Sequence, residues 1–248
     1  MTPALEVSGL ALTYPDGTEA LRGVDLSVDR GERVALLGPN GAGKTSLLLA
    51  LIGIVHPQRG TVRVGGLESG PDSLPEIRRR LGIVFQDPDD QLFMPTVSRD
   101  VAFGPANLGL DAEEVQRRSK AALEAVGMAA AGERAPHHLS GGEARRVAMA
   151  TVLAMEPDVL VLDEPSSNLD PVGRRELADL LAGLPTTLLV VTHDLPFALA
   201  LCGRSVILNG GVVAADGPTA RLLADTELMA TNRLELPYGF DPATIAGP

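Results

Sequence analysis

One short stretch of the chain carries backbone and side chains suited to binding phosphate. It reads glycine, four variable positions, glycine, lysine and threonine, and with the following serine it comprises Gly38, Pro39, Asn40, Gly41, Ala42, Gly43, Lys44, Thr45 and Ser46. Glycines let the backbone curl so that several N–H groups point at one phosphate. Lys44 would reach the β- and γ-phosphates of a nucleoside triphosphate, and the Thr45 hydroxyl would bind Mg²⁺. A plain glycine turn is the alternative, but the apolar strand predicted before the loop and the helix predicted after it favour a phosphate site.

Two acidic residues follow a short apolar run further along the chain. Residues 159–162 read Val-Leu-Val-Leu and predict a buried strand, with Asp163 and Glu164 at its carboxyl end. Open parallel sheets bind ligands at that edge. Asp163 would hold Mg²⁺ directly or through water, and Glu164 would polarise the water that attacks a phosphoryl group. Alone, such acids are as often solvated strand ends; beside a phosphate loop, the catalytic interpretation is favoured.

A third pattern, Leu-Ser-Gly-Gly-Glu at residues 139–143, precedes a predicted helix. Ser140 and Glu143 have the spacing of a capping box, which satisfies backbone groups at a helix start. Capping does not require two consecutive glycines, however. Gly141 and Gly142 would let a phosphate approach the exposed N–H groups closely, and both interpretations can hold together.

In this order, the three patterns resemble the ATP-binding subunit of ATP-binding-cassette (ABC) transporters. The resemblance extends over about residues 5–225, and the Leu-Ser-Gly-Gly element is very specific to this family, whereas many NTPases share the phosphate loop. It implies an α/β P-loop NTPase fold with a RecA-like core sheet, an N-terminal antiparallel β subdomain and a helical insert. It also implies that two subunits meet head to tail, so that Ser140, Gly141 and Gly142 of one close on the ATP held by Lys44 of the other.

Four further residues match functional positions of that family. Tyr14 would stack on adenine, although an ordinary strand tyrosine is the alternative. Gln86 would contact Mg²⁺ and the attacking water and would sense the membrane partner. His193 would contact the γ-phosphate. Asp170 ends a loop, residues 168–170, that would cross the interface between the two subunits.

The sequence departs from the family pattern at two places. Glu143 stands where many relatives have glutamine, and because a carboxylate near a bound triphosphate is unfavourable, we expect it to turn toward the Ser140 backbone. The crossing loop reads Ser-Ser-Asn-Leu-Asp at residues 166–170 instead of the commoner Thr-Ala/Ser-Gly/Ala-Leu-Asp. Neither departure removes a catalytic group.

Residues 86–110 and 145–157 resemble the energy-coupling-factor (ECF) class, which imports metal ions and vitamins, and most of all its cobalt/nickel branch. The resemblance implies a Mg²⁺-dependent ATPase that powers import of cobalt or nickel, or else of a vitamin. It would work as a homodimer or heterodimer of ABC ATPases bound to integral membrane subunits.

A soluble cassette ATPase acting on nucleic acid or the ribosome is an alternative, but the chain has neither a long coiled coil after the loop nor a second cassette. A P-loop kinase or GTPase would leave residues 139–143 and His193 unexplained.

The predicted elements place the chemistry along one edge of a sheet. Apolar runs predict strands at residues 5–14, 20–28, 33–37, 60–66 with its turn, 83–86, 159–162 and 187–191, and a hairpin at 205–215. Helices are predicted at residues 46–52, 143–155 and 176–181, and from Asp111 to Gly127, where Glu114 is the expected capping-box partner. Residues 87–110 show no clear period, and the chain from residue 226 is predicted to be irregular. We therefore predict a nucleotide-binding core at 1–86 and 140–225, a helical insert at 87–139 and a C-terminal tail at 226–248.

Composition narrows the class of protein. With 248 residues, 45% of them apolar, the chain can form one large α/β domain or two small ones. A net charge of −11, 3% aromatic residues and the lack of tryptophan argue against a nucleic-acid-binding surface. Cys202, the single cysteine, excludes an intramolecular disulfide and is expected in the core. No signal peptide and no apolar run of about 18 residues is found, so we expect a peripheral protein at the cytoplasmic face of the membrane.

Overall fold

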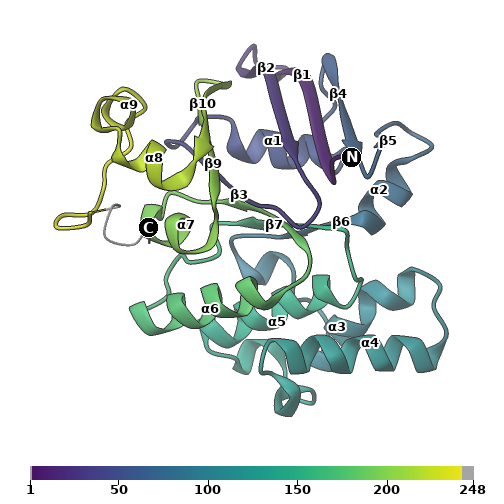
Figure 1. The fold of residues 1–248 in the computed structure, drawn as a ribbon. Helices are drawn as coiled ribbons and strands as arrows, with labels where there is room; N and C mark the ends of the chain where they lie inside the picture. Colours follow the sequence, from purple (N-terminus) through teal and green to yellow (C-terminus); the bar gives the residue numbers. More distant parts are fainter. Residues whose placement is uncertain (1, 242–248) are drawn as a thin grey trace.

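Two sheets with helices between and below them make up the computed structural model, which describes residues 2–241 (Figure 1). In spatial order the larger sheet consists of β10 (Val212–Pro218), β9 (Arg204–Asn209), β3 (Arg33–Leu37), β8 (Thr187–Val191), β7 (Val159–Asp163) and β6 (Leu81–Val84). The strands from β9 to β6 are parallel, and β10 pairs with β9 in the antiparallel direction. Strands β3, β6, β7 and β8 are buried along nearly their whole length, because helices or the second sheet cover both faces, as is typical of parallel sheets.

The smaller sheet comes from the N-terminal part of the chain. Its strands, in spatial order, are β2 (Glu19–Val28), β1 (Leu5–Thr13), β4 (Arg59–Val64) and β5 (Leu67–Glu68), and all neighbours are antiparallel. Helix α1 (Lys44–Leu51) lies between this sheet and the larger one (Figure 1). The antiparallel subdomain predicted at the start of the chain is therefore present, and it packs over the phosphate-binding helix.

The remaining helices pack around the larger sheet, with α2 on the same side as α1. They are α2 (Leu74–Arg80), α3 (Val97–Asn107), α4 (Ala112–Ala125), α5 (Gly141–Leu153), α6 (Pro171–Gly183), α7 (Leu195–Leu201), α8 (Thr219–Ala224) and α9 (Thr226–Thr231). Helices α3 to α6 lie below the sheet in Figure 1, on the side opposite α1. Among residues 2–241, none of the helices combines the length and the apolar character that crossing a bilayer requires.

Alternate residues of the central strands belong to two separate cores. Val34 and Leu36 of β3 pack with α1 and the antiparallel sheet, whereas Ala35 and Leu37 pack with α5 and the helical insert. This period-2 division fixes which face of β3 each side chain occupies. It also fixes the position of the loop that begins directly after Leu37. Cys202 is buried in the second of these cores, as predicted.

Two segments predicted to be irregular are helical. Residues 97–107 form α3, whose buried face is spaced at Val97, Val101 and Pro105; the proline and a buried Asp100 obscured this period in the sequence. Residues 226–231 form α9, which begins where the Asp225 carboxylate accepts the Leu228 N–H. The end of the predicted tail, from Pro242 to the Gly-Pro terminus, lies outside the described residues.

The predicted capping box at α4 is only half correct. The Asp111 carboxylate accepts the N–H of Glu114 at 2.9 Å and begins the helix as expected. The Glu114 carboxylate, however, accepts hydrogen bonds from Arg117 and Arg118 instead of returning to the Asp111 backbone. Two arginines one helical turn away offer charge-assisted hydrogen bonds, which are stronger than a bond from a neutral N–H.

Candidate functional site

The phosphate-type loop runs from the end of β3 to the start of α1 and is packed too closely for side chains at two of its glycines. A Cβ on Gly38 would lie 2.1 Å from the carbonyl oxygen of Leu208, and one on Gly43 would lie 2.5 Å from that of Ala20. Gly43 also has a φ of 103°, which residues other than glycine rarely adopt. The glycine pattern is therefore required by the loop's shape, which presents backbone N–H groups at the N-terminus of α1.

Lys44, the first residue of α1, is turned back over this loop. Its Nζ donates to the carbonyl oxygens of Gly38 and Pro39 at 2.5 and 3.0 Å. Burial lowers the pKa of Lys44, and the nearby charges of Glu164 and Asp163 act in the opposite direction. The lysine is thus a part-buried cation held beside two carboxylates, where a polyphosphate would be its natural counter-charge.

The two acids stand at the end of β7, as predicted. The pKa of Asp163 is raised to about 6, chiefly by burial and also by the charge of Glu164, while Lys44 opposes both. A cation bound beside Asp163 would remove this penalty. Thr45, Gln86 and Asp163 offer hydroxyl, amide and carboxylate oxygens, the hard ligands that Mg²⁺ prefers, so the residues present fit a magnesium ion.

Glu164 is held in place by residues that follow β8. Its Oε1 lies 2.8 Å from Nδ1 of His193, and its Oε2 accepts hydrogen bonds from the Thr192 hydroxyl at 3.1 Å and the His193 N–H at 3.3 Å. Glu164 is only 8% exposed and has a φ of 46°, an uncommon conformation for a residue other than glycine. The sequence analysis missed Thr192, whose only signal is that it is a polar residue between a buried strand and His193.

A cavity of about 320 Å³ brings many of the predicted residues together. Its walls are formed by Tyr14, Thr18, Glu19, Ala20, residues 40–46, Gln86, Asp163 and Glu164. The Tyr14 hydroxyl lies 3.1 Å from the Ser46 hydroxyl, which places the tyrosine at the side of the phosphate-type loop. Thr18, Glu19 and Ala20 were not predicted, because nothing in the sequence indicates that the start of β2 borders the loop.

The Leu-Ser-Gly-Gly segment begins α5, away from this cavity. Ser140 and Glu143 form the predicted capping box: the Ser140 N–H donates to Glu143 Oε2 at 2.8 Å, and Ser140 Oγ accepts from the Glu143 N–H at 3.3 Å. Glu143 is also paired with Arg134 at 2.7 Å. The hydrogen bond from Arg134, together with those at Ser140, lowers the pKa of Glu143 to about 2. The expected turn of Glu143 toward the Ser140 backbone is confirmed, and a neighbouring arginine reinforces it.

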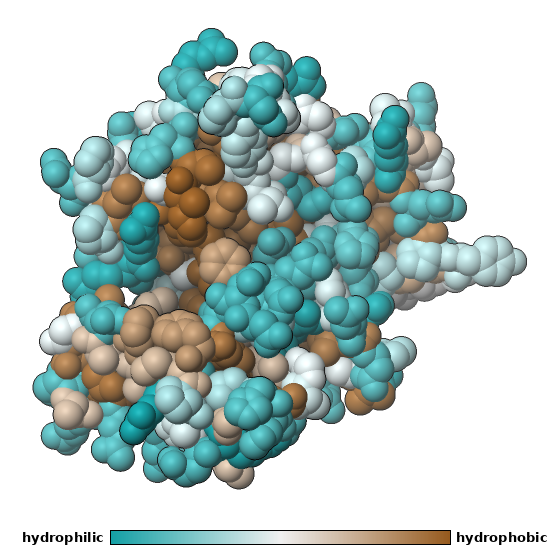
Figure 2. Space-filling view, turned by 180° about the vertical axis from the view of Figure 1, so that it is seen from behind, coloured by the Kyte–Doolittle hydropathy of each residue, from teal (hydrophilic) through white to brown (hydrophobic). Residues whose placement is uncertain are grey.

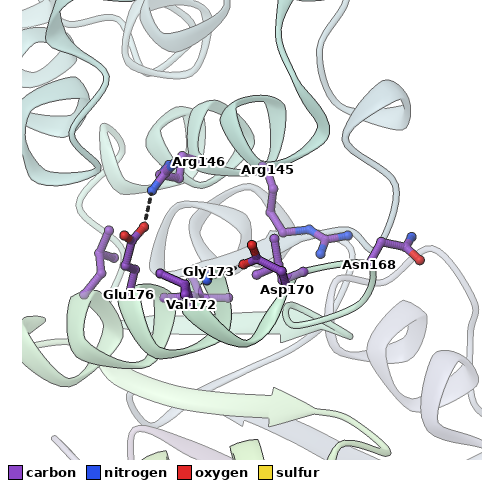
Figure 3. A pocket seen from close by; sticks show the side chains of 11 residues that line it. Arg145, Arg146, Asn168, Asp170, Val172, Gly173 and Glu176 are labelled. Atoms are coloured by element: carbon purple, nitrogen blue, oxygen red, sulfur yellow. Dashed lines mark hydrogen bonds and ion pairs between the residues drawn. The ribbon is translucent and has the colours of Figure 1, made fainter.

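Residues 166–170 lead from the acids into α6. Asp170 Oδ1 accepts the Gly173 N–H at 2.7 Å and so caps α6, and the Ser166 hydroxyl lies 3.0 Å from the Asp194 carboxylate. A cavity of about 450 Å³ lies between α5 and α6. Figure 3 shows Asp170 and Asn168 on one side of it. Within this chain, Asp170 and the two glycines of the Leu-Ser-Gly-Gly segment (Gly141 and Gly142, the signature glycines, at the start of α5, the signature helix) are therefore apart from the cavity that contains Lys44.

A glycine loop between a parallel strand and a helix, with two acids at the end of a second strand of the same sheet, defines a P-loop nucleotide hydrolase. Residues 21–167 match the family model described as ABC transporter. The chain therefore belongs to the ABC transporter ATP-binding family, and is an ATPase in which hydrolysis of ATP is coupled to transport.

Relatives at high identity extend over nearly the whole chain. A putative ABC transporter ATP-binding protein of Streptomyces avermitilis is 65% identical over 243 residues, which are 98% of this chain and 93% of the relative. The energy-coupling factor transporter ATP-binding protein EcfA of Methanothermobacter thermautotrophicus is 48% identical over 242 residues, 96% of this chain and 78% of the relative. The predicted ABC transporter ATP-binding subunit is thus confirmed.

Two solved structures share the fold. CbiO1 of Clostridium perfringens, described as part of the ABC transporter complex CbiONQ, has a TM-score of 0.84 and 37% identity, and the match covers 96% of this chain and 97% of CbiO1. The ATP-binding cassette MJ0796, described as a post-hydrolysis dimer bound to ADP and phosphate, has a TM-score of 0.77 and 28% identity, covering 87% of this chain and 98% of that one. The predicted P-loop fold is confirmed.

Proposed function

We propose that this chain is the ATPase of an ECF-type importer of cobalt or nickel ions, attached to the cytoplasmic face of the membrane through integral membrane subunits. The observation that carries the proposal is the cavity in which Lys44, Asp163 and Glu164 converge. The similarity to EcfA supports the ECF class, and the similarity to CbiO1 supports the cation cargo. Import of a vitamin is the second candidate, because the ECF class, which the similarity to EcfA supports, includes vitamin importers as well as importers of metal ions.

ATP would be held by the loop and the start of α1. The backbone N–H groups of residues 40–45 and the Lys44 ammonium would bind the phosphates, and Tyr14 at the side of the cavity would stack on adenine. Thr45, Gln86 and Asp163 would hold Mg²⁺, which when bound neutralises charge on the β- and γ-phosphate oxygens. Binding would replace the contacts that Lys44 makes with its own loop carbonyls.

Hydrolysis would be carried by Glu164. Its carboxylate would accept a proton from the attacking water as the water oxygen bonds to the γ-phosphorus, and the bond from that phosphorus to the bridging oxygen breaks to leave ADP and phosphate. His193 is 66% exposed at its side chain, so its second ring nitrogen can reach the γ-phosphate while Nδ1 holds Glu164. Gln86, at the cavity wall, would position the water.

A second ATPase subunit would complete each site. Gly141 and Gly142 line cavities that are separate from the one that contains Lys44. Within a single chain, these glycines and Lys44 therefore do not contact the same nucleotide. A Cβ on Gly141 would meet no atom within 4 Å, and the nearest contact at Gly142 is at 4.0 Å. This open helix start suits a phosphate group presented by a partner subunit. The dimeric state of MJ0796 with ADP and phosphate supports such an arrangement.

The membrane subunit would bind at the helical insert. A groove of about 950 Å³ between α3 and α4 is lined by apolar residues that include Ala102, Val115 and Leu123, and by charged residues such as Arg99 and Lys120. The Ser119 hydroxyl on this wall is buried and has no hydrogen-bond partner among the described residues. Figure 2 shows brown and tan side chains gathered toward the lower left of this face, the side on which α3 and α4 lie. A helix of the membrane subunit would cover the apolar wall and offer a partner to Ser119.

The proposal is tested by purifying the tagged chain from native membranes and identifying the integral proteins that accompany it. Ala106→Glu places a charge in the groove, whereas Ala121→Glu places the same charge on an exposed position of α4 outside it. We expect the wild type and Ala121→Glu to retain the same membrane proteins and Ala106→Glu to lose them while still binding ATP. Transport of cobalt or nickel by the recovered complex in vesicles supports the cation cargo, and transport of a vitamin instead supports the second candidate. Recovery of ribosomes or nucleic acid without membrane proteins would contradict the proposal.

A further inference from the structure

Arg145 places a buried guanidinium between the two loops that carry the predicted catalytic residues. Only 7% of this residue is exposed. Its Nη2 donates to the carbonyl oxygen of Gln86 at 3.1 Å, and its Nη1 donates to the carbonyl oxygens of Pro165, at 3.1 Å, and Ser167. Figure 3 shows the side chain extending from α5 toward the segment that holds Asn168 and Asp170. One side chain of the signature helix is thus bonded to segments that belong to both catalytic loops.

The bonding of Arg145 is unusual for a buried cation. All three acceptors are neutral carbonyl groups, and no carboxylate among the described residues is bonded to it. Burial lowers the pKa of Arg145, and the charge of Asp87 opposes this effect. Removing a cation from water without an ion-pair partner costs free energy that carbonyl contacts offset only in part. An arginine at this place is therefore better explained by what it positions than by the stability it adds.

The loop that Arg145 holds has open space on both sides. The cavity of about 450 Å³ between α5 and α6 and a second of about 430 Å³ that includes Asp87 and Gly141 both have Arg145, Asn168 and Leu169 on their walls. Side chains do not fill these spaces, and Leu169 is only partly buried against the core, so packing holds residues 167–169 to α5 on one side only. The planar guanidinium provides that link, since its fork of N–H groups reaches acceptors on separate segments at once.

We propose that Arg145 is a positioning residue: it links the position of Gly141 and Gly142, at the start of α5, to the positions of Gln86 and Glu164. The inference rests on the proposed head-to-tail dimer. When Gly141 and Gly142 close on the nucleotide of the partner subunit, α5 moves as a rigid element, and Arg145 carries that movement to the segment after β6 and to Pro165, the neighbour of Glu164. Binding of ATP on the partner would in this way align the water-positioning glutamine and the base in the chain's own site.

The test compares Arg145→Met, which keeps the length of the side chain but has no donors, with Arg146→Lys. Arg146 is the next residue of the same helix and pairs with the exposed Glu176 at 3.1 Å, an ion pair that lysine can keep. Each change is made in the full chain, both alone and together with Glu164→Gln. For Arg145→Met we expect ATP affinity and KM within about twofold of the wild type, kcat at least tenfold lower, and ATP-driven dimerisation of the double variant equal to that of Glu164→Gln alone. Arg146→Lys should keep kcat within about twofold.

The outcomes separate a positioning role from its alternatives. A kcat of Arg145→Met within twofold of the wild type, while Glu164→Gln still dimerises, overturns the role of Arg145 and leaves the proposed function intact. Parallel losses of ATP binding, dimerisation and thermal stability would show that Arg145 is only structural, and would also overturn the inference. A monomeric Glu164→Gln protein at saturating ATP overturns the head-to-tail dimer and, with it, the coupling proposed here.

Discussion

His193 and Glu164 form a hydrogen-bonded pair at the edge of the larger sheet, with Nδ1 of the histidine 2.8 Å from Oε1 of the glutamate. The His193 N–H also donates to Oε2 at 3.3 Å, so one residue holds both carboxylate oxygens. A hydrogen bond to an ionised Glu164 requires the proton on Nδ1, and the His193 side chain is 66% exposed. The ring can therefore connect the base to a γ-phosphate, and this geometry requires β7 and β8 to be neighbours, as they are.

Replacing the base should separate binding from hydrolysis. Glu164→Gln keeps the side-chain shape but cannot accept the proton of the attacking water, so we expect ATP turnover to fall about 100-fold or more. Binding should persist, and ATP should hold two subunits together, because hydrolysis of the bound ATP, which would separate them, no longer occurs. Turnover assays and size-exclusion chromatography with ATP measure the two effects. A protein that stays monomeric when saturated with ATP would count against the model; Glu176→Gln, at an exposed position of α6, serves as control.

Lys44→Ala should remove most of the nucleotide affinity. The substitution deletes a charge-assisted contact to the triphosphate, worth about 2–3 kcal/mol, and so should weaken binding roughly 30- to 150-fold. Titration with a fluorescent ATP analogue measures the change. Lys120→Ala is the matched control, because Lys120 has a side chain that is 76% exposed and pairs only loosely with Glu124 at 3.9 Å. If Lys44→Ala leaves the ATP affinity unchanged, the loop is not part of the nucleotide-binding site.

The parts of the fold that depend on local sequence were predictable. Buried strands such as β3 and β8 have the predicted bounds, because an uninterrupted apolar run between turn residues permits few other structures. Helix α3 was missed because Gly104 and Pro105 disfavour a helix locally, while its burial against α4 and α5 stabilises it. Tertiary packing decided that segment, and packing cannot be derived from a ten-residue window.

The residues of the candidate site likewise fall into those that the local sequence predicts and those that only the fold reveals. Loop and strand-end residues such as Lys44 and Asp163 were predicted because motif and strand lie next to each other in the chain. Thr192 and Arg145 were not, since their roles come from partners 28 and 59 residues away. A side chain that bridges distant segments has no periodic or motif signal, and only the folded geometry shows it.

Thr192 provides a test of how tightly the base must be held. Its buried hydroxyl donates to Glu164 and accepts the Asp194 N–H at 3.0 Å. Thr192→Val keeps the shape but removes the bond to the carboxylate, so we expect kcat to fall about tenfold with KM unchanged, because only the position of the base changes. Thr192→Ser should restore most of the rate. Equal rates for the valine and serine variants would show that the hydroxyl does not position Glu164.

The pairing of Glu143 with Arg134 makes a prediction about acid stability. The pKa of Glu143 is lowered to about 2 in the folded chain, from an ordinary value of 4.5. A lowered pKa means that the unfolded chain binds the proton more readily, so the ion pair stabilises the fold above pH 4.5 and this contribution is lost as the pH falls from about 4.5 toward 2.

Glu143→Gln keeps the bond to the Ser140 N–H but has no charge to lose. Its melting temperature should lie slightly below that of the wild type at pH 7, and the difference should shrink on acidification and in high salt. Arg134→Met, which removes the same pair from the other side, should give the same convergence. A difference between wild type and Glu143→Gln that is constant from pH 7 to pH 3 would show that the ion pair adds nothing to the stability of the signature helix.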